Sequence, residues 1–147
     1  MKSLIRLVIV DSNFILLPFQ FKIDYLEEIR MKVEGKLKFI IYQQIFNELE
    51  SKRKRKSKAT KFTRLLDSGL SYLEKNKPNF EIDFLEDVKN RDELTDEFLL
   101  RKSLELKDKG FLVFLATNDS ELRRKARRSE LNTIYLRQKK FLSIERV

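Results

Sequence analysis

The apolar run at residues 7–10 (Leu-Val-Ile-Val) ends in a single carboxylate, Asp11, and this junction constrains the fold more than any other segment. Four consecutive apolar residues predict a strand that is buried on both faces, since a half-exposed strand would alternate in polarity. Ser12 and Asn13, which follow, are favourable residues for starting a helix. In open α/β sheets, ligands bind beyond the carboxyl ends of the strands. Asp11 is therefore expected where a functional site would form.

The rest of the chain alternates between predicted strands and predicted helices. Buried strands are expected at residues 4–10, 37–42, 111–116 and 133–136, with a short alternating strand near residues 80–84. Helices are expected at residues 13–21, 24–34, 43–53, 60–75, 92–109 and 120–129, with Pro18 ending the first and Asp24 capping the second. This alternation indicates a three-layer α/β/α fold with a mostly parallel central sheet. We expect one domain over residues 1–147, with a basic loop at about 52–58 and a basic C-terminal tail at about 137–147.

Two missing residue types exclude several kinds of site. The 147 residues include no cysteine and no histidine. Disulfides, thiolate or imidazole metal sites and Ser-His-Asp triads are therefore excluded. A bound metal would have only oxygen ligands, which favours a hard cation such as Mg²⁺ or Mn²⁺.

The charge balance predicts a polyanionic partner. The chain carries 32 Lys and Arg against 23 Asp and Glu, a formal net charge of +9. Nucleic acid is the first expectation and an anionic membrane surface the second. No apolar run reaches the roughly 18 residues of a membrane span, so no transmembrane segment is expected. No export signal is recognised, and the cytoplasm is the expected location.

Four carboxylates occupy positions from which they could converge on one site. Asp11 and Asp119 follow two of the buried strands, and their side chains would meet if those strands are neighbours. Glu48 lies three residues after Ile45, near the buried face of its predicted helix. Asp96 lies in the first turn of another predicted helix. The four acids together, in a chain without His or Cys, favour an acidic metal site.

Each of these acids also has a purely structural explanation. Asp11 could cap the helix that follows it. Asn118 and Glu121 fit a capping box, which would leave Asp119 as a first-turn acid favoured by the helix dipole, and Thr95 could cap the helix of Asp96 in the same way. Glu48 could form an ion pair with Lys52 one turn later.

Four segments carry a resemblance to PIN-domain ribonucleases that extends over nearly the whole chain. They are Val-Asp-Ser-Asn-Phe at residues 10–14, Ile-Phe-Asn-Glu-Leu at 45–49, Leu-Thr-Asp-Glu-Phe-Leu-Leu at 94–100 and Thr-Asn-Asp-Ser-Glu-Leu at 117–122. They place Asp11, Glu48, Asp96 and Asp119 at the acidic positions of the family. Asp96 takes the third position because its spacing to Leu99, Leu100 and Gly110 fits the family pattern. The strings at residues 18–21 and 135–139 resemble an archaeal branch akin to PIN proteins that process ribosomal RNA precursors.

The resemblance implies a divalent-metal-dependent endoribonuclease with one or two Mg²⁺ or Mn²⁺ ions. The four acids would bind the metal and form the catalytic site, and Ser12, Asn13, Thr117 and Asn118 would support them. The products would carry a 5′-phosphate and a 3′-hydroxyl. Pre-ribosomal RNA or ribosomal particles are the implied partners, and self-association into a homodimer is left open.

Basic clusters are expected to bind the RNA backbone. They comprise Lys52, Arg53, Lys54, Arg55, Lys56 and Lys58, then Arg123, Arg124, Arg127 and Arg128, then Arg137, Lys139 and Lys140. The alternative for each cluster is a solvated helix face, and the nearby aromatic residues Phe62 and Tyr135 are expected in the core. Two other functions stay open: an RNA-binding ribosome-assembly module with weak or no cleavage, and the toxin ribonuclease of a toxin–antitoxin pair.

Overall fold

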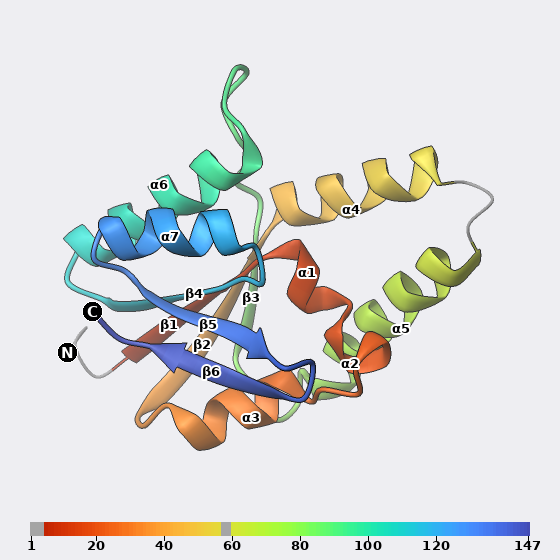
Figure 1. Ribbon diagram of the computed structural model, residues 1–147, viewed down its shortest axis with the longest axis horizontal. Helices are drawn as coiled ribbons and strands as arrows, with labels where there is room; N and C mark the ends of the chain where they lie inside the picture. Colours follow the sequence, from red (N-terminus) through yellow and green to blue (C-terminus); the bar gives the residue numbers. More distant parts are fainter. Residues whose placement is uncertain (1–4, 57–59) are drawn as a thin grey trace.

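The computed structural model describes residues 5–56 and 60–147, which form strands and helices in near-regular alternation (Figure 1). The strands are β1 (Ile5–Val10), β2 (Lys36–Tyr42), β3 (Ile82–Leu85), β4 (Leu112–Ala116), β5 (Asn132–Arg137) and β6 (Phe141–Glu145). The helices are α1 (Ser12–Ile15), α2 (Leu17–Gln20), α3 (Tyr25–Lys32), α4 (Gln43–Arg55), α5 (Thr60–Asn76), α6 (Thr95–Asp108) and α7 (Ser120–Arg128). No helix of the described part is long and apolar enough to cross a membrane.

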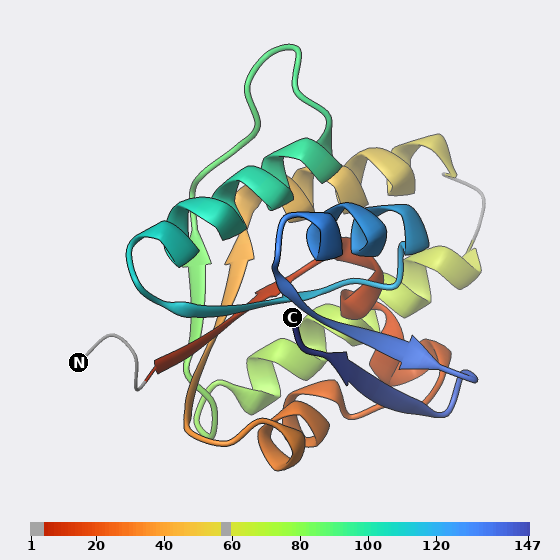
Figure 2. The ribbon, with the colours of Figure 1, turned by 60° about the vertical axis from the view of Figure 1, so that its left-hand side comes forward.

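The strands of the described residues form one sheet in the order β3-β2-β1-β4-β5-β6. Neighbours from β3 to β5 are parallel, and β6 pairs antiparallel with β5. Helices α6 and α7 cover one face of the sheet, and α3 and α5 cover the other (Figures 1 and 2). The predicted three-layer α/β/α fold with a mostly parallel sheet is confirmed.

The strand order of the sheet reverses its direction between β1 and β4. From β1 the chain proceeds to β2 and β3 on one side, and then returns to place β4 on the other side of β1. Val10 pairs with Ala116 in this register, and the Asp11 N–H donates to the Ala116 carbonyl at 2.9 Å. The carboxyl ends of β1 and β4 are therefore adjacent at a topological switch point, the usual position of a ligand site in such sheets.

The core of the sheet follows the apolar runs of the sequence. Residues 7–10 of β1 and 113–116 of β4 are buried, as predicted for strands that are covered on both faces. Next to this core, α5 packs against α1 at Gly69. A Cβ atom at this position would lie only 2.0 Å from the Ile15 carbonyl oxygen, so the close approach of the two helices requires glycine.

The segment after Asp11 differs from its prediction. It forms two helices of four residues each instead of one helix over 13–21, and Pro18 lies at the start of α2 instead of ending a helix. Proline is tolerated in a first turn because the missing N–H would have no helical partner there. Asp24 occupies the predicted N-cap position of α3, but its side chain makes no cap bond, and its Oδ1 accepts from the Tyr72 hydroxyl at 2.5 Å.

The prediction for the C-terminal region missed β6. The strand expected to be the last, at 133–136, continues to Arg137, and residues 141–145 of the expected basic tail return along it as an edge strand. Gln138 and Lys139 both have positive φ, 54° and 56°, and lie in the hairpin turn at residues 138–140 that joins β5 to β6. Such turns usually carry Asn or Gly, so their usual sequence signal is missing here. Helix α6 also begins later than predicted, at Thr95 instead of residue 92.

Tyr72→Phe is expected to destabilise the protein by about 1–2 kcal/mol, because a partly buried N–H loses its acceptor. The Tyr72 hydroxyl accepts from the Leu26 N–H at 2.9 Å while it donates to Asp24. Urea unfolding would measure the change, with Ser71→Ala on the exposed side of the same helix as the control. Equal stability of Tyr72→Phe and the parent would contradict this role of the hydroxyl.

Candidate active site

The Asp11 carboxylate is buried and held in one orientation at the end of β1. Its Oδ1 accepts from the Ser12 N–H at 2.7 Å, which makes Asp11 the cap of α1. Its Oδ2 accepts from the Thr117 hydroxyl at 2.6 Å and from the Asn13 side-chain amide at 3.3 Å. The structural explanation of Asp11 as a cap is thus correct for one oxygen, and the second oxygen faces the end of β4.

The loops after β1 and β4 are joined by polar side chains. The Thr117 hydroxyl accepts from the Asp119 N–H at 3.1 Å, and Asn13 Oδ1 accepts from the Asn118 N–H at 3.0 Å. Asn118 Oδ1 in turn accepts from the Leu136 N–H in β5 at 2.7 Å. Three of the four predicted supporting side chains therefore fix the two loops, whereas Ser12 contributes mainly its backbone N–H.

Asp119 is exposed and caps α7 itself. Its Oδ1 accepts from the N–H groups of Glu121 and Leu122 at 2.9 and 3.2 Å. The alternative capping box of Asn118 and Glu121 is wrong, because the Asn118 side chain is bonded to β5. Since both cap bonds of Asp119 use Oδ1, its Oδ2 can bind a ligand without loss of the cap.

Glu48 and Thr95 connect α4 to the start of α6. The Thr95 hydroxyl donates to Glu48 Oε2 at 2.9 Å. Glu48 is exposed, although its neighbours on α4, Gln44, Ile45 and Leu49, are buried. The expected Thr95 cap is also wrong: α6 begins after Leu94, whose N–H donates to Glu97 Oε1 at 2.8 Å. Lys52 lies 5.2 Å from the Phe62 ring centroid, so its contact is with that ring and not with Glu48.

The acids are close enough to shift one another's proton affinity. Burial is the main cause that raises the pKa of Asp11, hydrogen bonds from Thr117 and Ser12 oppose it, and the charges of Asp96 and Asp119 raise it further. Burial also raises the pKa of Asp96, followed by the charge of Asp119. Lys125 opposes this rise, and Glu121 and Glu48 add to it. All four predicted acids therefore lie in one region of negative potential.

Sequence reasoning missed two members of this region. Glu121 adds a fifth negative charge near Asp96, although it was considered only as part of a cap. Thr95 was also considered only as a cap, yet its hydroxyl holds Glu48. The short polar residues near a helix start suit both a cap and a site, and only the neighbouring helix shows which role applies.

The donor set fits a hard divalent cation. All side chains that converge here offer oxygen, and the charges of the acids disfavour one another without a counter-ion. Across residues 5–56 and 60–147, no three Asp or Glu side chains are close enough to surround one ion directly. Mg²⁺ keeps several water ligands in most protein sites, so fewer than three direct carboxylate contacts are compatible with its binding here.

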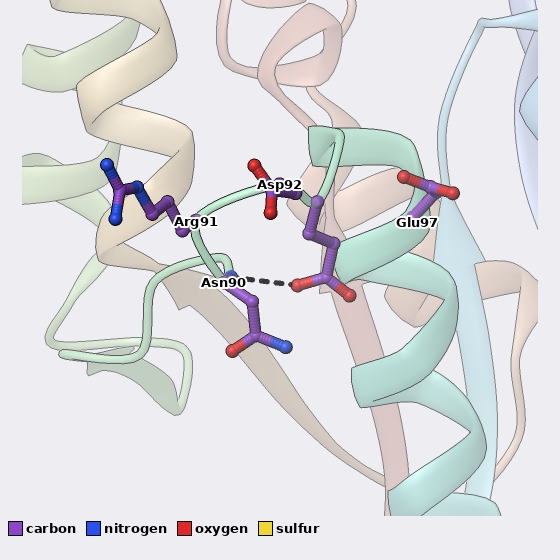
Figure 3. A pocket seen from close by; sticks show the side chains of 5 residues that line it. Asn90, Arg91, Asp92 and Glu97 are labelled. Carbon is purple, nitrogen blue, oxygen red and sulfur yellow. Dashed lines mark hydrogen bonds between the residues drawn. The ribbon is translucent and has the colours of Figure 1, made fainter.

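Three other acids near Asp96 in the sequence have different surroundings. Asp92, Glu93 and Glu97 line a cavity of about 500 Å³ with Asn90 and Arg91, on the loop before α6 and its first turn (Figure 3). Glu93 accepts from the Asn90 N–H at 3.0 Å and pairs with Arg101 at 2.8 Å, which lowers its pKa to about 2. The lining of this cavity contains none of the four converging acids.

The predicted basic loop begins as the end of α4. Lys52, Arg53, Lys54 and Arg55 form its last turn, where positive charge also favours the helix dipole, and Lys56 follows in a turn. Lys58 lies outside the described residues. Arg53 pairs with Glu50, and this ion pair makes the Arg53 guanidinium less available to RNA. Phe62 is in the core, as predicted.

The other predicted cations lie on α7 and on the β5–β6 turn. Arg123 is 3.8 Å from the centroid of the half-buried Tyr135 ring, and Arg127 pairs with Glu145 at 3.1 Å. Arg124 and Arg128 are exposed on α7, and Arg137, Lys139 and Lys140 are exposed at the carboxyl end of β5. Because β5 is parallel to β4, this last group lies at the same edge of the sheet as the acids.

Comparisons with known proteins agree with this fold. A relative from Methanocaldococcus jannaschii, ribonuclease VapC4, is 30% identical over 137 residues, which cover 93% of this chain and 95% of the relative. A solved structure, the PIN domain endonuclease Utp24, superposes with a TM-score of 0.66 over 96% of this chain and 92% of that chain, at 20% identity, which shows a shared fold. The family model described as PIN like domain matches residues 8–139, a range that includes all four acids. This chain therefore belongs to the PIN-like domain family.

Proposed function

We propose that this protein is a divalent-metal-dependent endoribonuclease with Asp11, Glu48, Asp96 and Asp119 in its active site. The observation that carries the proposal is the buried Asp11 carboxylate at the β1–β4 switch point. Burial raises the pKa of Asp11, and the charges of two further carboxylates, Asp96 and Asp119, raise it more. A buried negative charge in acidic surroundings is costly unless a cation binds there. The ribonuclease and endonuclease names of the two relatives agree with this function.

The side chains of the site have distinct tasks in this proposal. Asp11 and Asp119 are the principal ligands, directly or through water, and Glu48 and Asp96 complete the site. A bound Mg²⁺ or Mn²⁺ would lower the pKa of a water ligand and polarise the scissile phosphate. Thr117 and Asn13 hold Asp11 in position, and Thr95 does the same for Glu48. None of these supporting contacts needs to break when RNA binds.

The exposed cations provide the contact surface for RNA. Arg137, Lys139 and Lys140 at the end of β5, and Arg124 on α7, are the nearest exposed members by topology, since β5 and α7 both adjoin the loop of Asp119. Lys52, Lys54 and Arg55 extend this surface along α4 from Glu48. Ribosomal RNA precursors as the substrate, the cytoplasm as the location and a single domain over residues 1–147 remain parts of the proposal.

The direct test is cleavage of labelled single-stranded and structured RNA in Mg²⁺, in Mn²⁺ and in EDTA. We expect cutting in either metal, none in EDTA, and products that carry a 5′-phosphate. Tight, salt-sensitive RNA binding without cutting under all conditions would contradict the proposal and favour an RNA-binding assembly module instead.

Thr117→Val is expected to lower the cleavage rate by about 10- to 100-fold, because Asp11 loses the hydroxyl that orients it. Valine has nearly the same shape as threonine, so the packing under the site is retained. Thr117→Ser keeps the hydroxyl and should retain most of the activity. If valine and serine reduce the rate equally, the methyl group matters and not the hydrogen bond to Asp11.

A further inference from the structure

Two segments that are far apart in the sequence meet on a surface beside the site. They are the Pro-Phe-Gln-Phe string at residues 18–21, which forms most of α2, and the string at residues 135–139, which ends in the β5–β6 turn. Lys139 Nζ lies 5.9 Å from the centroid of the Phe21 ring. Figures 1 and 2 both show the tip of the β5–β6 hairpin next to α2. The two strings therefore form one surface feature.

A pocket opens on this surface between α2 and α5. It has a volume of about 410 Å³ and is lined by Phe19, Gln20, Phe21, Lys61, Arg64 and Leu65. Phe19 is unusually exposed for an aromatic residue, at 62%. An exposed phenylalanine in a pocket offers a flat apolar face to a ligand at no cost to the core.

The charges around this pocket are all positive. Lys61 and Arg64 are three residues apart on α5, and both are exposed. No carboxylate lines the pocket, and among the described residues neither side chain forms an ion pair. Lys139 adds a third cation at the rim, next to Arg137 and Lys140. A partner for this pocket must therefore combine a flat apolar group with negative charge on either side of it.

We propose that this pocket is a subsite for single-stranded RNA, in which an unpaired base stacks on Phe19 and the flanking phosphates contact Arg64, Lys61 and Lys139. This inference rests on the proposed function and adds a base-stacking subsite to it. Base stacking on aromatic side chains within a basic groove is the general way in which proteins hold single strands. A paired base has its faces covered in the helix, so the subsite selects unpaired segments.

The position of the pocket suits a substrate that also reaches the acids. Phe19 follows Asp11 by eight residues, which are almost entirely helical in α1 and α2. Helical residues rise about 1.5 Å each, so the path summed along the two helices is on the order of 12 Å, and the pocket lies a short stretch of RNA from the site. The cations of the β5–β6 turn also lie at the sheet edge that carries Asp119. The strand would thus be held on one side of the cleavage position.

The test measures the affinity for a short, unstructured, fluorescently labelled RNA in Mg²⁺, with Asp11→Asn as the non-cleaving parent. Adding Phe19→Ala is expected to weaken binding by about ten-fold, the loss of roughly one stacked base, whereas Phe19→Trp should retain it. The matched control is Phe84→Ala, which removes an aromatic side chain of 40% exposure with Lys77 Nζ 5.0 Å from its ring, in a pocket that Glu74 also lines. This control should bind within two-fold of the parent.

The charge is tested separately on α5. Arg64→Gln should reduce the dependence of affinity on salt by about one unit of log–log slope, as expected for one lost phosphate contact. Lys75→Gln removes the same charge from the far end of the same helix and should leave the slope unchanged. Equal effects of the two changes would mean that net charge matters and that the pocket binds no phosphate.

The outcomes for the subsite and for the enzyme can be told apart. Binding of Mn²⁺ alone, measured by titration calorimetry, involves no aromatic group, so Phe19→Ala alone should leave it unchanged and report on the acids only. Unchanged RNA affinity of Phe19→Ala, or no RNA binding by the parent, would overturn the subsite. In either case metal-dependent cleavage by the wild-type protein would still decide the proposed function. A selective loss with Phe19→Ala supports RNA over a protein ligand in this pocket.

Discussion

Asp11→Asn is expected to lower metal-dependent RNA cleavage by about three orders of magnitude or more, which corresponds to about 4 kcal/mol of transition-state stabilisation. The substitution keeps an oxygen for the Ser12 N–H and removes the negative charge that faces Thr117 and the end of β4. Asp96 and Asp119 remain, so residual metal binding is expected without efficient cleavage. Rates in Mn²⁺ at saturating RNA would measure the loss, since weaker RNA binding then has no effect.

A matched control separates this result from a general effect of lost charge. Asp108→Asn makes the same change at an exposed residue that ends α6, and it should cleave at the parental rate.

The native state holds a proton on Asp11 more tightly than the unfolded chain does, because burial raises its pKa above the ordinary 3.8. At pH values above 3.8 the Asp11 charge therefore lowers the free energy of unfolding. This destabilisation grows as the pH rises through the raised pKa of the folded state. Metal-free Asp11→Asn should then be at least as stable as the parent at neutral pH. Parental cleavage by Asp11→Asn would show that Asp11 is not a metal ligand.

The positions of Asp11 and Asp119 could be predicted from local sequence patterns because an uninterrupted apolar run comes shortly before each. The runs at residues 7–10 and 113–116 are apolar without interruption. In a chain that alternates with helices, such short apolar runs favour buried strands. The polar residues after them must then lie at a carboxyl edge. That β1 and β4 are neighbours follows from the return of the chain across the sheet, which depends on contacts that no local pattern encodes.

The features that were missed are those in which tertiary contacts override a local signal. The hairpin turn at Gln138 and Lys139 adopts positive φ without Gly or Asn, because the pairing of β5 with β6 supports it. Thr95 has the residue type of a cap, yet its hydroxyl is bonded to Glu48 on another helix. Asp119 was considered as either a first-turn residue or a site residue, and the structure shows that its cap uses one oxygen only. For Thr95 the decisive neighbour, Glu48, lies 47 residues away in the sequence.

Gly69→Ala is expected to destabilise the protein by about 2–4 kcal/mol, although alanine usually favours a helix by up to about 1 kcal/mol over glycine. The added Cβ would lie 2.0 Å from the Ile15 carbonyl oxygen and 3.0 Å from its carbon. Both are backbone atoms, so no side-chain rotation can relieve the overlap, and α1 and α5 must separate. Urea unfolding would measure the loss. Ser68→Ala, on the preceding residue of α5, has the same new side chain without the overlap and should match or slightly exceed the parent.

This change also tests whether α1 fixes the site. Helix α1 starts at the Ser12 N–H that binds Asp11, and Asn13 within it holds both Asp11 and the loop of Asn118. A shift of α1 away from α5 therefore moves the acid and its support together, and misplacement of a catalytic group by about 1 Å can cost about 100-fold in rate. We expect Gly69→Ala to cleave more slowly than Ser68→Ala at a temperature where both are folded. Reduced stability with unchanged cleavage would mean that α5 moves while α1 stays in place. The geometry of the active site would then be fixed by the edge of the sheet alone.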